Sequence, residues 1–278
     1  MRLAGLGASF LVAALAAGPW IRDMWAAGLR RENWRAREVA FPAGAVLVAC
    51  SLVTLAPLAI LDDRADVDLL DPDLARWSVF VIGVALLGLI DDTMGGAGGL
   101  RTPRGWRGHA RAVMHGKFST GAVKAVGAIG LAAFATLGNR NDLHYVVDLL
   151  LLLLTTNLFN LIDLRPGRVE KALVLLLAGV CLGAWTAAPI DLLGVFIGPV
   201  LVVAAFTLRE GAMLGDTGSY LAGAIAGISL LVGIPFAGRL IALAIVVALT
   251  IFGEFRSISR TIERVPLLRS LDSLGRLP

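Results

Sequence analysis

The chain has 278 residues, of which 57% are hydrophobic and 17% are charged, and its formal net charge is +4. Soluble domains carry about a quarter charged residues, so this composition excludes an ordinary soluble enzyme and indicates an integral membrane protein. The two cysteines, Cys50 and Cys181, lie in separate apolar runs and offer neither a disulfide framework nor a metal-ligand spacing.

Nine apolar runs are long enough to cross the hydrocarbon core of a bilayer as helices. They cover residues 3–20, 43–61, 74–90, 121–138, 144–162, 172–188, 190–208, 217–234 and 237–255. The first run resembles a signal peptide, but the arginine-rich stretch after it favours a retained helix. Pro189 and Pro235 mark two tight connections, and different boundaries near Pro189 leave eight to ten helices open. We expect an all-α integral membrane protein with one polytopic domain, 1–278, ending in a basic tail, 256–278.

Basic residues are concentrated in alternate connections between these runs. The connections 21–42, 91–120, 163–171 and 209–216 and the tail 256–278 together hold 19 of the 25 lysines and arginines. The positive-inside rule therefore places these segments in the cytoplasm, with the N-terminus outside and the C-terminus inside. Cytoplasmic loops would then form any site that the polar residues of these segments create.

Two adjacent aspartates, Asp91 and Asp92, end the third apolar run on its cytoplasmic side. Neighbouring carboxylates repel each other unless they are solvated, paired with a basic group or neutralised by a metal ion. The pair is therefore either functional or a solvated helix end. Lys117 and Lys124 follow, and they are two of only three lysines in an arginine-dominated chain. Lysine carries a compact charge suited to phosphate, although Lys124 has the alternative of snorkelling to the interface.

Asn157, Asn160 and Asp163 are spaced three residues apart at the cytoplasmic end of the fifth run. This spacing stacks them on one broad face of a helix. Side-chain amides there can bind phosphate, sugar or another helix, and the carboxylate can accept a proton or bind a metal. Interhelical hydrogen bonding explains one such asparagine well but three polar groups poorly, so a functional role is favoured.

The segment 215–219, Gly-Asp-Thr-Gly-Ser, opens the eighth run. Asp216, Thr217 and Ser219 are ordinary residues for the start of a helix, so capping is one explanation of the motif. The same helix N-terminus also presents free N–H groups to an anion, and Asp216 could hold a Mg²⁺ that bridges a diphosphate.

All four polar clusters fall on the same predicted side of the membrane. A charge at membrane depth costs roughly 2.5–3.5 kcal/mol on insertion scales, so such residues are rarely without a function. Their convergence at one interface indicates a metal and phosphate site.

The order of these motifs resembles that of the polyprenyl-phosphate N-acetylhexosamine-1-phosphate transferase family. The set comprises Pro-x-Gly at 42–44, Asp-Asp at 91–92, a lysine-bearing span, Asn-x-x-Asn-x-x-Asp at 157–163 and Gly-Asp-x-Gly-Ser at 215–219. The resemblance implies a multi-helix fold in the bacterial inner membrane, with cytoplasmic loops around a Mg²⁺ site. It also implies an enzyme of cell-envelope glycan synthesis that transfers a sugar-1-phosphate from a UDP-amino sugar to polyprenyl (undecaprenyl) phosphate.

The resemblance also assigns roles to individual residues. Asp91 and Asp92 would position or deprotonate the lipid phosphate, and Lys124 would neutralise phosphate charge. Asp216, together with Asp92, would ligate Mg²⁺. The other expected site residues are Asp163 in catalysis and Asn157, Asn160, Lys117, Ser219 and Arg165 in substrate binding. The expected partners are a polyprenyl phosphate lipid and a UDP-sugar, with a homodimer or other envelope-synthesis proteins as open alternatives, and no nucleic acid.

Three features depart from the family pattern. Pro166 stands where the family has a second aspartate after Asp163, Phe206 stands where it has an asparagine, and the tail has no histidine. These departures leave a second hypothesis open, in which the chain is a catalytically impaired relative that serves as a membrane scaffold or binds polyprenyl lipids. A transporter is a third alternative, but no inverted repeat supports it.

Overall fold

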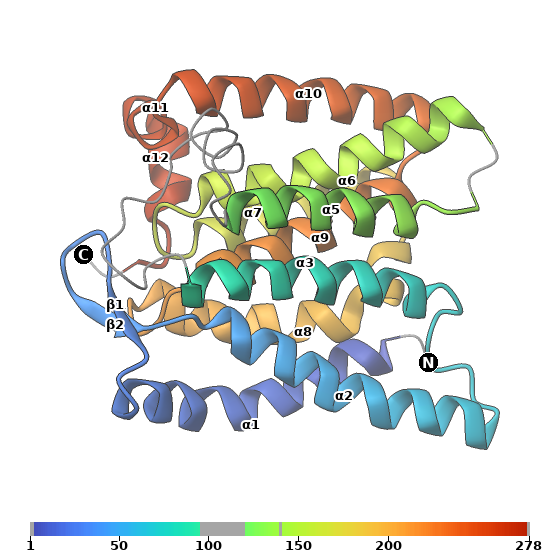
Figure 1. Cartoon of the computed structure of the whole chain (residues 1–278), viewed down its shortest axis with the longest axis horizontal. Coiled ribbons are helices and arrows are strands. Elements are labelled where there is room, and N and C mark those ends of the chain that lie inside the picture. Colours follow the sequence, from blue (N-terminus) through green and yellow to red (C-terminus); the bar gives the residue numbers. More distant parts are fainter. Residues whose placement is uncertain (1–2, 95–119, 139–140, 277–278) are drawn as a thin grey trace.

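The computed structural model describes residues 3–94, 120–138 and 141–276, and these form an elongated bundle of roughly parallel and antiparallel helices (Figure 1). The long helices follow the predicted apolar runs one by one. They are α1 (Ala4–Ala26), α2 (Gly44–Ala65), α3 (Leu74–Met94), α5 (Thr120–Ala135), α6 (Asp142–Ile162), α7 (Arg168–Gly183), α8 (Ala188–Leu208), α9 (Gly215–Gly233) and α10 (Phe236–Phe255).

Six of these helices, α1, α2, α3, α6, α8 and α10, are long and apolar enough to cross a membrane. The chain is therefore a helical, multi-pass membrane protein. Helices α5 and α7 have only 16 residues each, and α9 has 19 residues, most of them buried against neighbouring helices. Nine crossing helices thus remain a prediction. Both predicted proline breaks are confirmed, because Pro189 lies in the first turn of α8 and Pro235 caps α10.

A short β-hairpin corrects the expectation of a purely helical chain. Strand β1 (Arg30–Glu32) pairs antiparallel with β2 (Glu38–Ala40) in the segment between α1 and α2. The Asn33 side chain shapes the turn, since its Oδ1 accepts hydrogen bonds from the backbone N–H groups of Arg35 and Arg37 at 2.8 and 3.0 Å. Such short, charged strands lack the alternating apolar pattern that would predict them.

The hairpin lies at the same end of the bundle as two short C-terminal helices, α11 (Ile258–Arg264) and α12 (Pro266–Ser273). We call this the site end. The N-terminal end of the described chain lies at the opposite end of the bundle (Figure 1). Backbone hydrogen bonds tie the hairpin to the segment before α9, from Ala40 to Gly211 at 3.3 Å and from Met213 to Ala40 at 2.9 Å.

The first turn of α9 lies unusually close to α3, and a glycine permits this contact. A Cβ atom on Gly88 would lie 2.5 Å from the carbonyl oxygen of Asp216 and 2.6 Å from the backbone nitrogen of Thr217. Both neighbours are backbone atoms, which cannot rotate away as a side chain can. Gly88 therefore fixes the distance between α3 and the beginning of α9.

We expect Gly88→Ala to lower the stability of the folded protein by about 1–3 kcal/mol, the usual cost of overpacking. Thermal unfolding in detergent measures this loss. Gly130→Ala is the matched control, since a Cβ on Gly130 of α5 meets no atom within 4 Å. A Gly88→Ala protein as stable as the control would contradict the close approach of α3 and α9.

Candidate functional site

The Asp92 carboxylate at the end of α3 caps the N-terminus of α9. Its Oδ1 accepts a hydrogen bond from the backbone N–H of Asp216 at 2.9 Å. Its Oδ2 accepts from the backbone N–H and the hydroxyl of Thr217 at 2.9 and 2.6 Å. The side chain is only 8% exposed, so these contacts compensate for its burial. Capping of this kind satisfies free N–H groups and places a negative charge at the positive end of the helix.

Lys124 joins the other two carboxylates of this region. The Nζ atom of Lys124 on α5 lies 3.2 Å from Oδ2 of Asp91 and also donates a hydrogen bond to Oδ2 of Asp216. It lies 4.7 Å from the centre of the Tyr220 ring. Since the lysine side chain is only 12% exposed, it is a partner of these groups and does not snorkel into solvent. The predicted convergence of Asp91, Lys124 and Asp216 is present in the structure.

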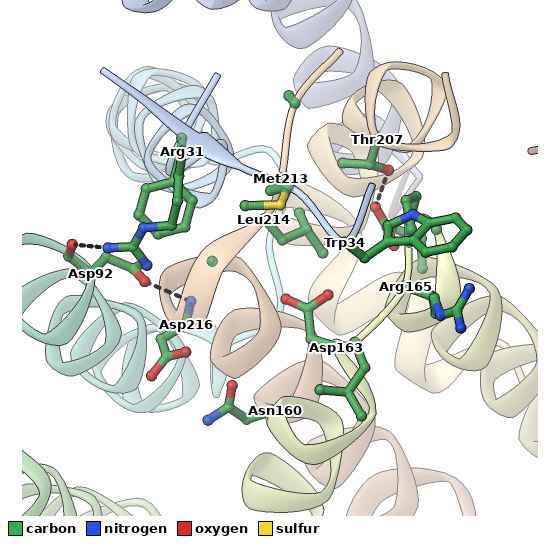
Figure 2. A pocket seen from close by; sticks show the side chains of 17 residues that line it. Arg31, Trp34, Asp92, Asn160, Asp163, Arg165, Thr207, Met213, Leu214 and Asp216 are labelled. Atoms are coloured by element: carbon green, nitrogen blue, oxygen red, sulfur yellow. Dashed lines mark hydrogen bonds between the residues drawn. The ribbon is translucent and has the colours of Figure 1, made fainter. Parts of the chain in front are cut away.

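Helix α6 brings its polar residues to the same region. The hydroxyl of Ser219 donates a hydrogen bond to Oδ1 of Asn160 at 3.1 Å, which links α9 to α6. Asp163 follows the last turn of α6 and points into the same cavity as Asn160 and Asp216 (Figure 2). Asn157 lies one turn earlier on α6 and is not among the described residues that line the cavity.

This cavity has a volume of about 220 Å³ and opens at the site end of the bundle. Its charged lining consists of four acidic residues and two arginines, which are Asp92, Asp163, Glu170, Asp216, Arg31 and Arg165. Burial raises the pKa of Asp163 well above its usual value, and the neighbouring charges of Glu170, Asp216 and Asp92 raise it further. A raised pKa disfavours the charged form of Asp163, a form that a bound cation would favour again, and an anion needs a positive group to enter the cavity.

Several residues that line this cavity are absent from the sequence-based predictions, among them Arg31, Trp34, Glu170 and Thr207. Arg31 and Trp34 come from the hairpin, and their role depends on a hairpin that the pattern did not reveal. Glu170 and Thr207 also line the wall, and the Thr207 hydroxyl donates a hydrogen bond to the buried Glu170 carboxylate. Glu170 could have been predicted from the sequence, since a glutamate at the start of an apolar run must find a buried partner.

The departures from the family pattern have clear places in the structure. Pro166 lines the cavity, where it contributes no carboxylate. Phe206 turns away from the cavity and contacts α1 near Gly18. Lys117, predicted to bind substrate, lies outside the described residues.

The C-terminal segment packs against the loop 163–167. The Asp272 carboxylate on α12 accepts two hydrogen bonds from Arg168, at 2.8 and 3.1 Å, and also pairs with Arg276. The Arg276 side chain in turn donates a hydrogen bond to the carbonyl oxygen of Pro166 at 2.9 Å. The predicted basic tail therefore folds against the site, where Arg276 and Asp272 form a cluster with Arg168.

The donor atoms of the cavity suit Mg²⁺. In phosphate sites Mg²⁺ binds one or two protein carboxylates and takes its other ligands from water and substrate phosphates. Asp163 and Asp216 face one cavity and supply such a pair of carboxylates. No group of three His, Cys, Asp or Glu side chains among the described residues forms a complete metal centre. Asp92 is less available as a ligand, because both of its oxygens already accept hydrogen bonds from α9.

No protein-family model and no curated protein matches this sequence. The geometry of the site and the order of its motifs are therefore the observations that bear on function.

We expect Asp92→Ala to destabilise the protein more than Asp91→Ala. The first change removes a buried carboxylate that accepts three hydrogen bonds, which costs about 1.5–3 kcal/mol or more, since each is a bond to a charged group. The second removes a carboxylate that pairs with Lys124 but whose side chain is 29% exposed, so water can replace part of what is lost. Urea or thermal unfolding of both variants measures the difference. Equal stabilities would show that the cap does not support α9.

The docking of α12 should depend on pH through Asp272. Burial alone would raise the pKa of this carboxyl, but hydrogen bonds from Arg168 and Arg276 lower it below its usual value of 3.8. A lowered pKa means that the docked state favours the carboxylate, so docking is fully stabilised above pH 3.8 and weakens as the pH falls through the lowered value. Protease cleavage between α10 and α12, followed against pH, measures this. Asp272→Asn should be cleaved quickly even at neutral pH.

Proposed function

We propose that this protein is a Mg²⁺-dependent membrane phosphoglycosyltransferase. It would transfer a sugar-1-phosphate from a UDP-amino sugar to a polyprenyl phosphate at the cytoplasmic leaflet of the bacterial inner membrane. The site end would then face the cytoplasm, in agreement with the distribution of basic residues along the chain.

The observation that carries this proposal is the meeting of Asp91, Lys124 and Asp216 beside a cavity that Asn160 and Asp163 also face. These residues come from four helices, α3, α5, α6 and α9, and from the loop after α6. Phosphoryl transfer requires charge neutralisation and in-line positioning more than covalent chemistry by the protein. Carboxylates that could hold a cation, together with one lysine at the same place, would supply these requirements.

Each residue of the site would have its own role in the transfer. Lys124 would neutralise charge on the acceptor phosphate, and Asp91 would accept its proton or orient it. Asp163 and Asp216 would hold Mg²⁺, which supplies positive charge to the diphosphate of the donor. Asp92 would act indirectly, by fixing the first turn of α9 and thereby the backbone that carries Asp216.

One observation favours the second candidate function, a non-catalytic scaffold or polyprenyl-lipid binder. Lys124 already pairs with both Asp91 and Asp216, so the charge of these carboxylates is partly compensated within the protein itself. Together with Pro166 in the cavity wall, this pairing suits a protein that binds a phosphate lipid without transferring a sugar to it. Lipid binding without release of UMP would identify this function.

A transfer assay tests the proposal with the purified protein, Mg²⁺, undecaprenyl phosphate and radiolabelled UDP-sugars. We expect a lipid-linked product from at least one donor, and none after removal of Mg²⁺ with EDTA. Asp216→Asn should reduce turnover roughly 100- to 1,000-fold, the typical cost of losing one electrostatic contact in a transition state. The folded state should remain, as judged by thermal unfolding.

Asp142→Asn is the matched control, since Asp142 is exposed in the first turn of α6 at the opposite end of the bundle. It should leave turnover unchanged. Full activity of Asp216→Asn would refute the role of this carboxylate. The absence of product across UDP-GlcNAc, UDP-MurNAc-pentapeptide and related donors would refute the enzymatic function.

A further inference from the structure

We propose that Arg31 and Arg165 form a diphosphate clamp at the mouth of the cavity, and that the β1–β2 hairpin positions both of them. The clamp would hold the diphosphate of the donor nucleotide, so this inference rests on the proposed function. The clamp also gives the hairpin a role, since none of the sequence motifs lies in the hairpin.

Arg31 is fixed by two contacts. Its guanidinium group stacks on the ring of Phe41 at 3.9 Å, and its Nη2 donates a hydrogen bond to the carbonyl oxygen of Asp92 at 3.2 Å. A guanidinium group has five N–H donors, and this hydrogen bond uses one of them. The group is therefore oriented by its surroundings while it lines the cavity.

Arg165 reaches the cavity from the loop after α6, and the hairpin holds it in place. Its guanidinium group lies 4.0 Å from the centre of the Trp34 ring in the hairpin turn, and it pairs with Glu263 of α11 at 2.7 Å. The hairpin turn is itself anchored to Glu210, which pairs with Arg35 at 3.3 Å and accepts a hydrogen bond from Asn33 at 3.2 Å. The Trp34 ring is thus part of an anchored turn.

Figure 2 shows Arg31 and Arg165 on opposite sides of the cavity, with Asp163 and Asp216 also facing it. Arginine suits this place because its planar fork binds phosphate oxygens in pairs. Four carboxylates line the same cavity, so a diphosphate can enter only where fixed positive groups offset them.

The position of the two arginines favours the donor nucleotide over the acceptor lipid. Arg31 and Arg165 belong to segments beyond the helix ends, and Trp34 beside them is 43% exposed. Lys124, in contrast, lies within α5 and contacts α3 and α9. A water-soluble nucleotide approaches from beyond the helix ends, whereas a lipid phosphate approaches along the helices from the membrane.

The hairpin also provides matched controls. Arg30 precedes Arg31 on β1, and side chains of successive residues in a strand point to opposite faces. Accordingly Arg30 pairs with Glu38 at 3.1 Å and stacks on Trp25 at 5.3 Å, and it is not among the described residues lining the cavity. Arg30→Gln and Trp25→Ala therefore change the same residue types outside the proposed clamp.

Calorimetric titration of the purified protein in nanodiscs with UDP and UMP, in the presence of Mg²⁺, tests the clamp. Arg31→Gln and Arg165→Gln should each weaken UDP binding about 10- to 100-fold, the loss expected when a hydrogen-bonded charge is removed. UMP, with one phosphate, should lose less, so the preference for UDP over UMP falls. Trp34→Ala should act in the same direction by releasing Arg165. Arg30→Gln and Trp25→Ala should stay within about twofold of the wild type.

The clamp is overturned if Arg31→Gln binds UDP like the wild type, if Arg30→Gln weakens UDP binding as much, or if the wild type binds no UDP. It is also overturned if Arg31→Gln weakens binding of undecaprenyl phosphate alone, which would assign the arginine to the lipid. The transfer assay separates the two proposals. UDP binding that depends on Arg31, without any transfer, supports the clamp and refutes the transferase. Transfer that is unaffected by Arg31→Gln supports the transferase and refutes the clamp.

Discussion

The hydrogen bonds from the first turn of α9 to the Asp92 carboxylate join the end of α3 to the beginning of α9. Their geometry requires two glycines. Gly88 lets the helices approach, and Gly215 has a φ of +71° and no room for a Cβ, which would lie 2.6 Å from Oδ2 of Asp92. Because the backbone of Asp216 is held by this contact, the direction of its side chain is set as well. The pairing with Lys124 and the bond from Ser219 to α6 both build on that placement.

Two segments outside the long helices support the loop 163–167 of the cavity wall. The hairpin contacts the loop 163–167 through Trp34 and Arg165, and the C-terminal segment contacts it through Arg276 and Pro166. Both contacts use arginine, whose guanidinium group can stack on a ring and donate to a carbonyl oxygen at once. The loop that carries Asp163 is therefore held from two sides, by the Trp34 ring on its own Arg165 and by the Arg276 side chain on the carbonyl oxygen of Pro166.

The positions of the helices were predictable because hydropathy follows burial in lipid directly, and Pro189 and Pro235 break the chain for local steric reasons. The sequence also indicated that Asp91, Lys124, Asn160 and Asp216 would meet. It could not distinguish the cap at Asp92 from a metal ligand, since that role depends on how closely α3 and α9 approach. The hairpin was missed because three-residue charged strands have no periodic signal. Helix α1 ends at Ala26, beyond the predicted run 3–20, because hydropathy alone does not mark where a helix ends.

The position of Lys124 between Asp91 and Asp216 has a consequence for how a cation and an anion would affect each other's binding. The ammonium group serves as a counter-ion within the protein, so these carboxylates are tolerated at membrane depth before any cation arrives. A divalent cation that bound Oδ2 of Asp216 would displace the lysine, and an anion would offer the displaced lysine a new partner. Cation and phosphate would therefore strengthen each other's binding reciprocally, and neither alone would bind as tightly as the two together.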